Sequence, residues 1–151
     1  MESIEDYWKR FLKETNRPQQ CPYAGEMEFA DNKEDSIYFL SQILSGQKQA
    51  NFTTLKSFEI DMESLPKKGF YSILVDYLEN PVGVIETVDV LIVPFNQITQ
   101  EMAMWDGSSS SLEEWRAFKK EEFIYDGQVM GYEFDESMPV VIDKFNLVWK
   151  N

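Results

Sequence analysis

The spacing of apolar residues predicts two helices in the first third of the chain. Over Ser3–Glu14, apolar side chains recur at i, i+3, i+4, i+7 and i+8, the stripe of an amphipathic helix that Ser3 would cap. The stretch 18–32 is rich in turn-forming residues and lacks periodicity, which indicates a loop. A second helix follows, with Asp31 or Asn32 as its cap, and it should end at Gly46.

From Phe52 onward the period shortens toward two, which predicts strands. Four segments combine β-branched and aromatic residues: Thr54–Ile60, Phe70–Leu78, Val82–Val93 and Val140–Trp149. The turn residues at 79–81 predict an antiparallel hairpin of the second and third. Between the strands we expect short helices at 97–104 and 112–123 and a weak strand at 124–134. Because strands and helices mix without βαβ alternation, we expect a single α+β domain over residues 1–151 with a mainly antiparallel, barrel-like sheet.

Composition and charge exclude several classes of function. The 151 residues include 14 Lys and Arg against 27 Asp and Glu, a net charge of −13, and no histidine. Without imidazole, Ser-His-Asp and Cys-His nucleophilic sites and His-bearing zinc sites are excluded. A net charge of this size repels phosphate backbones, which disfavours long double-stranded DNA. A nucleoside or a short single strand brings fewer phosphates and is disfavoured less.

Cysteine content and the N-terminus bear on location and cofactors. The single Cys21 permits neither an internal disulfide nor a Cys-rich metal site, and no apolar run approaches the roughly 18 residues that span a bilayer. The first residues are acidic, whereas a signal peptide begins with basic ones. We therefore expect a cytoplasmic protein with no metal, no cofactor and no membrane partner.

Two predicted strands each carry a carboxylate within an apolar row. Alternation places Glu86 among valines and Asp143 among bulky apolar residues. An ionised carboxylate is costly to bury, so it must pair with a cation, be protonated or line a wet cavity. Glu86 would have no functional role if it formed a structural ion pair or if a bulge in the strand turned it outward. Asp143 lies near a strand start, from which its side chain can reach solvent.

The junction between the second helix and the first strand is a further candidate, because loops held by rigid elements often carry sites. Lys48 in this junction is the cation expected opposite Glu86, although it would also complement the negative end of the preceding helix. Stacking platforms for a base would be Phe52, Trp105 and Trp115, of which Trp115 also fits a helix face packed on the sheet. The charges of 119–122 cancel and indicate a solvated helix surface.

Six segments carry one family pattern in order along the chain: Phe29–Asp31, Leu44–Ala50, Pro81–Thr87, Ile92–Phe95, Ser111–Arg116 and Met138–Val141. Together they resemble the bacterial ASCH-domain proteins, from about Trp8 to the C-terminus. The resemblance implies a PUA-like fold, a small β-barrel with flanking helices. Its core would span about residues 24–149, with the helix at about 3–15 packed on it and a cleft at the Gly46-x-Lys48 loop.

For function, the resemblance implies a cleft that binds RNA or a modified nucleoside, since ASCH domains are generally proposed to bind RNA. The residues expected to bind are Gly46, Lys48, Asn51, Phe52, Thr53, Glu86 and Asp143. Some relatives are described as amidohydrolases of acetylated cytidine or as ribonucleases. In the amidohydrolase pattern a Lys, a Thr three residues later and a strand Glu form the catalytic set, and these positions hold Lys48, Asn51 and Glu86 here.

Two departures from that pattern keep the alternatives open. An asparagine amide is not a nucleophile, so a threonine nucleophile would have to be Thr53 or Thr54. Near Trp115, where relatives often carry a histidine, this chain has Lys119. One alternative to binding is hydrolysis of the exocyclic amide of an acylated cytidine-type nucleoside, with Lys48 as base or oxyanion holder. The other is a protein-interaction module with a vestigial cleft.

Overall fold

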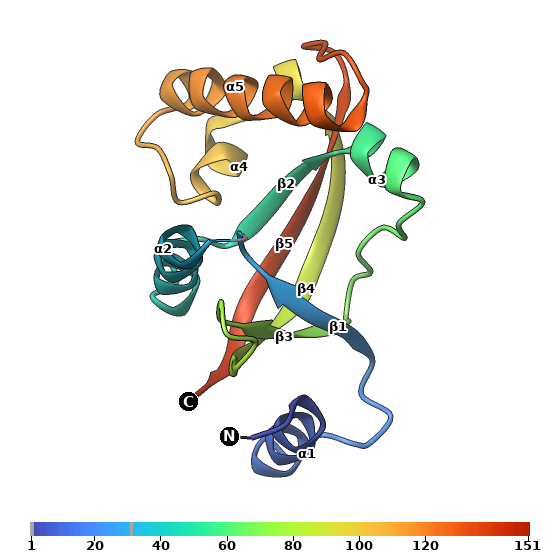
Figure 1. The fold of residues 1–151 in the computed structure, drawn as a ribbon, viewed down its shortest axis with the longest axis vertical. Coiled ribbons are helices and arrows are strands. Elements are labelled where there is room, and N and C mark those ends of the chain that lie inside the picture. Colours follow the sequence, from blue (N-terminus) through green and yellow to red (C-terminus); the bar gives the residue numbers. More distant parts are fainter. Residues whose placement is uncertain (1, 31) are drawn as a thin grey trace.

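The computed structural model describes residues 2–30 and 32–151 and arranges helices around one curved sheet (Figure 1). In chain order the elements are α1 (Ile4–Glu14), β1 (Tyr23–Glu28), α2 (Lys33–Leu44), β2 (Ala50–Thr54), α3 (Leu55–Asp61), β3 (Tyr71–Val75), β4 (Pro81–Pro94), the 3₁₀ turn η1 (Phe95–Gln97), α4 (Gln100–Met104), α5 (Leu112–Met130) and β5 (Pro139–Lys150).

The sheet has the strand order β1-β3-β4-β5-β2. β1 pairs parallel with β3, and the other neighbours pair antiparallel, including the expected hairpin of β3 and β4. The edge strands β1 and β2 do not pair over the described residues, although Asn51 Nδ2 lies 3.5 Å from Met27 Sδ across the gap. The predicted α+β, mainly antiparallel architecture is confirmed, and the sheet is curled without closing into a barrel.

Side-chain caps begin the main helices, as the sequence predicts. Ser3, Asn32 and Ser111 each accept a hydrogen bond from the backbone N–H three residues later. Asp31, the other candidate cap of α2, lies outside the described residues. Over residues 2–30 and 32–151, no helix combines the length and the hydropathy needed to cross a membrane.

Three predicted elements are wrong. The expected loop 18–32 contains β1, an edge strand whose residues are mostly exposed and therefore show no alternation. The expected strand 54–60 is α3, because the Thr54 hydroxyl caps a helix instead of extending the strand. The expected strand 124–134 is mostly the end of α5, whose buried face continues to Gly127 in spite of the β-branched residues there.

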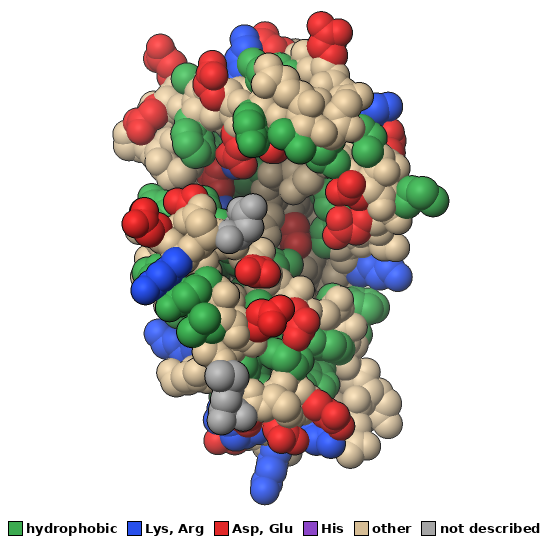
Figure 2. Space-filling view, viewed as in Figure 1, with side chains coloured by type: hydrophobic (Ala, Val, Ile, Leu, Met, Phe, Trp, Pro, Cys, Tyr) green, Lys and Arg blue, Asp and Glu red, His purple; other side chains and the backbone are tan. Residues whose placement is uncertain are grey.

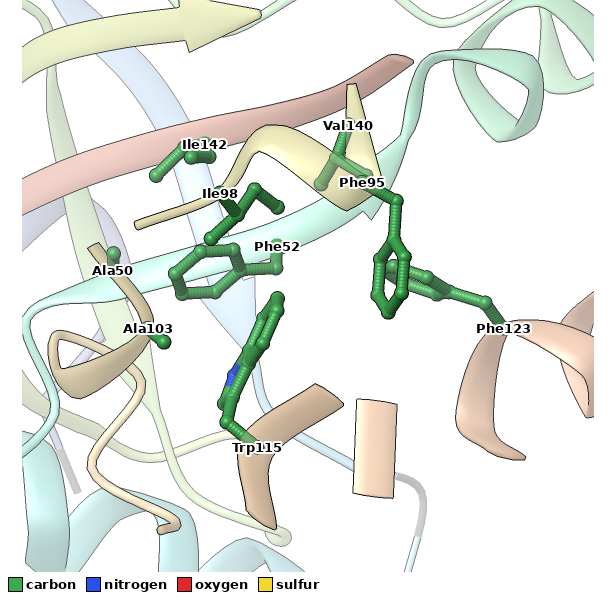
Figure 3. Close-up of a cluster of buried hydrophobic side chains, with 9 residues drawn as sticks. All are labelled: Ala50, Phe52, Phe95, Ile98, Ala103, Trp115, Phe123, Val140 and Ile142. Atoms are coloured by element: carbon green, nitrogen blue, oxygen red, sulfur yellow. The ribbon is translucent and has the colours of Figure 1, made fainter. Parts of the chain in front are cut away.

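The core has three parts. One lies between α4, α5 and the sheet, where Trp115 of α5 faces Phe52 of β2 (Figure 3): Ala50, Phe52, Phe95, Ile98, Ala103, Trp115, Phe123, Val140 and Ile142. Another holds α1 on one face of β3 and β4: Tyr7, Phe11, Leu12, Ile73, Val75 and Val84. The last holds α2 on the other face: Phe29, Leu40, Ile43, Leu74, Ile85 and Phe145. Because α2 covers only one end of that face, the rest of it lines a cavity.

Candidate functional site

Two adjoining cavities open beside α2. The strand cavity, of about 640 Å³, lies on the concave face of the sheet, and the lysine cavity, of about 250 Å³, lies between α2, β2 and α5. They share Phe29, Ala30, Asn51 and Thr53, so they form one cleft, seen in Figure 2 as a hollow in the middle of the molecule. The larger cavity alone falls within the range of about 300–1,000 Å³ of small-molecule sites.

The floor of the strand cavity begins where α2 stops covering the sheet. In each of β3, β4 and β5, the residue under α2 is apolar and the residue two positions nearer the cavity is polar. The apolar residues are Leu74, Ile85 and Phe145, and the polar residues are Ser72, Thr87 and Asp143, which are 7%, 5% and 6% exposed. Burying polar side chains in three strands at one level is costly, so the row indicates a binding surface instead of plain core.

Asp143 is the charged member of this polar row. Its Oδ1 accepts a hydrogen bond of 2.9 Å from Thr87 Oγ1. Burial raises the pKa of Asp143, and the bond from Thr87 offsets only part of that rise. Asn51 lies opposite Asp143 in the pairing of β2 with β5 and also lines the cavity. A carboxyl group and an amide therefore stand side by side on the floor.

Aromatic side chains form the walls of the strand cavity and acidic ones its rim. The aromatic residues of the walls are Phe29, Phe58 and Phe70, whereas Tyr23, which also lines the cavity, packs its ring on Trp8 of α1 at 4.8 Å between centroids. Glu26, Glu28 and Glu63 are exposed at the same cavity, and the cation there is Lys67. Several acidic side chains surround the hollow in Figure 2. Flat apolar walls with a polar floor suit an aromatic heterocycle, and the rim disfavours phosphate groups.

The lysine cavity contains a buried cluster of charges. Lys48 Nζ donates to Asp106 Oδ1 at 2.5 Å, and Lys119 Nζ lies 3.2 Å from Asp106 Oδ2, with all three side chains at most 6% exposed. Trp115 Nε1 donates to the same Oδ2 at 2.9 Å. Lys119 also pairs at 2.9 Å with Glu122, whose side chain is 42% exposed. One aspartate thus holds two buried ammonium groups.

The surroundings give the two lysines different acidities. Burial lowers the pKa of Lys48 and outweighs the stabilising charge of Asp106. For Lys119, burial acts in the same direction, but Asp106 and Glu122 together raise the pKa. Burial alone would raise the pKa of Asp106, and the two lysines lower it. Lys48 is therefore the group of this cluster that gives up its proton more readily than an ordinary lysine.

Local contacts hold this cluster in place. The side chains of Gln42 and Gln47 both donate to the carbonyl oxygen of Gly107 at 2.9 Å. Gly107 has φ +76°, and a Cβ there would lie 2.8 Å from the Gln47 carbonyl oxygen, so only glycine permits this close approach. This close packing positions Asp106, the residue before Gly107, so that its carboxylate reaches Lys48.

The structure brings most of the predicted binding residues to the cleft. Asn51 and Thr53 line both cavities, Asp143 lines the strand cavity, and Lys48 and Phe52 line the lysine cavity. Phe52 is also part of the core and packs on Trp115 at 5.1 Å between ring centroids. Gly46 follows the C-cap Ser45 of α2 with φ +83° and lines neither cavity, and its contribution is the turn that leads to Lys48.

Glu86 does not face Lys48. It is half-buried and pairs in register with Tyr71 and Asn146, and it lines neither of the two cavities. Its neighbour Thr87 is on the cavity face, so alternation puts Glu86 on the opposite face, the one that α1 covers. The expected pair of Lys48 with Glu86 is replaced by Lys48 with Asp106, a residue that no pattern in the sequence marks.

The buried face of α5 changes the interpretation of two of its residues, Lys119 and Trp115. The segment 119–122 is not a fully solvated surface, because Lys119 is buried. Its spacing held the signal: Trp115, Lys119 and Phe123 recur at i, i+4 and i+8 on the buried face of α5. Trp115 is a core residue, 0% exposed, so it offers no stacking surface. Among residues 2–30 and 32–151, no three His, Cys, Asp or Glu side chains are grouped to hold a metal ion.

Comparison with known proteins gives a family and similar solved structures, two of which are described below. The model of the ASCH domain family matches residues 25–149. The crystal structure of protein EF3133 from Enterococcus faecalis is similar with a TM-score of 0.83 and 24% identity, covering 97% of this chain and 88% of that one. An ASCH domain from Lactobacillus crispatus has a TM-score of 0.81 and 20% identity, covering 99% and 98%. These structures show the fold, and no curated protein matches significantly.

Proposed function

Because this chain belongs to the ASCH domain family, a PUA-like fold often linked to RNA binding, we propose that its cleft binds a nucleoside. The observation that supports this most is the strand cavity, where aromatic walls enclose a buried polar row on three adjacent strands. A base stacks on aromatic rings and offers polar edges, so it satisfies both features in one ligand. The base would lie on Asn51 and Asp143, and the sugar would point to the rim.

The charges at the cleft favour a nucleoside over a longer RNA. Three glutamates stand at the rim with one lysine, and the whole chain carries a net charge of −13. Each phosphate of a bound strand would enter a negative potential. Short single-stranded RNA is therefore the weaker ligand in this proposal, with only a terminal nucleoside inside the cavity.

Calorimetric titration with unmodified and modified nucleosides tests the proposal. We expect dissociation constants below about 1 mM for at least one nucleoside and a loss of about 10-fold in Asn51→Ala, because one or two hydrogen bonds disappear. Asn146→Ala is the matched control, since Asn146 is an exposed asparagine on β5. No binding of any nucleoside would contradict the proposal and would favour the protein-interaction alternative.

Hydrolysis of an acylated nucleoside is a second candidate, and the buried Lys48 favours it. Its lowered pKa suits a general base or a group that holds an oxyanion, and Asn51, which lines both cavities, would hydrogen-bond the reacting carbonyl. This route assigns no step to Glu86, which stands on the other face of the sheet. A threonine nucleophile would be Thr53, which lines the cleft, and not Thr54, whose hydroxyl caps α3.

Multiple turnover of an acylated cytidine separates this candidate from plain binding. The expected rate rises with pH as Lys48 loses its proton and disappears in Lys48→Ala, while Lys56→Ala, an exposed lysine on α3, keeps wild-type activity. Binding without turnover would leave the protein as a nucleoside reader.

A further inference from the structure

We infer that the nucleoside is of guanine type, and that Asp143 and Asn51 select it by pairing with its N1–H, 2-amino and O6 groups. The inference rests on the nucleoside binding proposed above and adds the identity of the base. A guanine edge presents two adjacent N–H donors followed by one carbonyl acceptor. Its complement is a carboxylate beside an N–H donor, which is the combination that the floor of the strand cavity provides.

The carboxyl group of Asp143 has an oxygen available to a ligand. Thr87 occupies Oδ1, and among the described residues no donor reaches Oδ2. No cation pairs with Asp143 in the described part of the chain, which is unusual for an aspartate 6% exposed. An unpaired carboxylate in such a place is stabilised by a ligand that brings N–H donors. N1–H and the 2-amino group of guanine are such donors.

Asn51 stands in the right place for the third contact. It is the register partner of Asp143 across the β2–β5 pair, so the two side chains project from the same face at adjacent positions. Among residues 2–30 and 32–151, the one contact of its Nδ2 is weak, 3.5 Å from the sulfur of Met27. An amide N–H is therefore free to donate to O6 while Asp143 accepts from N1–H.

Uracil, adenine and cytosine fit Asp143 and Asn51 less well than guanine does. Uracil offers a single N–H between two carbonyl oxygens, and a carboxylate repels carbonyl oxygens. Adenine and cytosine offer one amino donor beside an unprotonated ring nitrogen. The amino group would donate to one carboxylate oxygen of Asp143, and the lone pair of the ring nitrogen would face the other oxygen. Buried polar groups left unpaired are what makes such sites reject analogues.

The acidic groups around the cavity reinforce this selection. Glu26 and Glu28 of β1 and Glu63 after α3 are exposed where the cavity that holds Asp143 opens, and Lys67 is the described cation there. Their field favours ligand edges that carry N–H donors over edges that carry carbonyl oxygens. Because burial raises the pKa of Asp143, guanine binding must also remove a proton from this carboxyl at low pH. Affinity should therefore fall as the pH is lowered.

The test is a titration series with guanosine, inosine and xanthosine on the wild type and on Asp143→Asn, an isosteric change. We expect the wild type to bind guanosine at least about 10-fold more tightly than inosine, which lacks the 2-amino group. Xanthosine, with a carbonyl in place of that amino group, should bind the wild type more weakly still. In Asp143→Asn the new amide N–H donates to that carbonyl, so the order of guanosine and xanthosine should reverse, and the pH dependence of guanosine binding should vanish.

The possible failures are distinguishable. If no nucleoside binds the folded wild type, nucleoside binding itself is wrong. If nucleosides bind but guanosine and inosine bind equally, or if Asp143→Asn keeps the wild-type order, the base assignment is wrong while nucleoside binding stands. Asp89→Asn, an exposed aspartate on β4, is the matched control and should leave both order and affinity unchanged.

Discussion

Asp106 is the residue on which the buried charges of the cleft depend. Among the described residues, it is the one negative side chain buried in the lysine cavity, and it contacts both Lys48 and Lys119. Removing one partner of a buried ion pair leaves an uncompensated charge. We expect Asp106→Asn to lower the free energy of unfolding by about 3–5 kcal/mol in urea titrations near neutral pH.

Glu122→Gln provides the control for this prediction. The Glu122 side chain is 42% exposed, so its pair with Lys119 is partly screened by water. A change within about 1 kcal/mol is expected. Equal losses in the two variants would show that Asp106 does not hold the cluster together.

Asp143 gives a prediction for the pH dependence of stability. Its pKa is raised above the ordinary 3.8, so between that value and the folded-state pKa the folded protein binds a proton that the unfolded chain has lost. The stability contributed by Asp143 therefore falls as the pH rises through this window. We expect Asp143→Asn to be more stable than the wild type near pH 7, and the gain to disappear below pH 3.8.

The measurement is a pair of urea titrations, one at neutral pH and one below the window, with wild type and variant side by side. The difference between the two proteins cancels the other carboxylates that titrate in this range. A variant less stable than the wild type at both pH values would contradict the prediction.

At the scale of elements, the connection 105–111 between α4 and α5 determines whether Asp106 reaches Lys48. Gly107→Ala would place a Cβ 2.8 Å from the Gln47 carbonyl oxygen at φ +76°. We expect a loss of about 2–4 kcal/mol in unfolding free energy, from left-handed strain plus the clash, and weaker ligand binding because the cluster shifts.

Gly46→Ala separates the effect of backbone strain from the effect of a steric clash that displaces the site. Gly46 has a similar φ of +83°, but a Cβ there meets nothing within 4 Å. Only the backbone cost of about 1–2 kcal/mol is expected, with ligand affinity retained. Loss of affinity in both variants would mean that the fit of Gly107 against Gln47 is not what positions the site.

Local sequence patterns predict some elements of the fold and miss others. The helix α1, the helix α2 and the hairpin of β3 and β4 follow from periodicity and turn residues, because their own residues bury their apolar faces. β1 pairs with a strand more than 40 residues later and is mostly exposed, so nothing in its own sequence marks it. Lys48 and Asn51 stand at positions of the family pattern, and Asp143 interrupts an apolar row, so the sequence marks all three. The partner of Lys48 depends on a contact between loops 58 residues apart, which spacing cannot reveal.

At the scale of the whole molecule, the net charge of −13 should make the affinity for charged ligands depend on salt concentration. Glu26, Glu28 and Glu63 are exposed where the strand cavity opens, so they raise the negative potential near any group that projects from it. A nucleoside 5′-monophosphate should therefore bind several-fold more weakly than its nucleoside at about 10 mM salt, where the Debye length is about 30 Å. The gap should narrow at about 150 mM, where that length is about 8 Å, because the repulsion is screened.

This salt dependence has the opposite sign from that of proteins that neutralise phosphates, whose affinity falls steeply as salt is added. Calorimetric titration of the nucleoside and its monophosphate at both salt concentrations measures it. Glu63→Gln should reduce the gap at low salt, since it removes one exposed rim charge, whereas Glu113→Gln on α5, which lines neither cavity, should not. Tighter binding of the monophosphate, weakened by salt, would show that a lysine of the cleft, either Lys67 or one of the buried cluster, binds the phosphate in spite of the acidic rim.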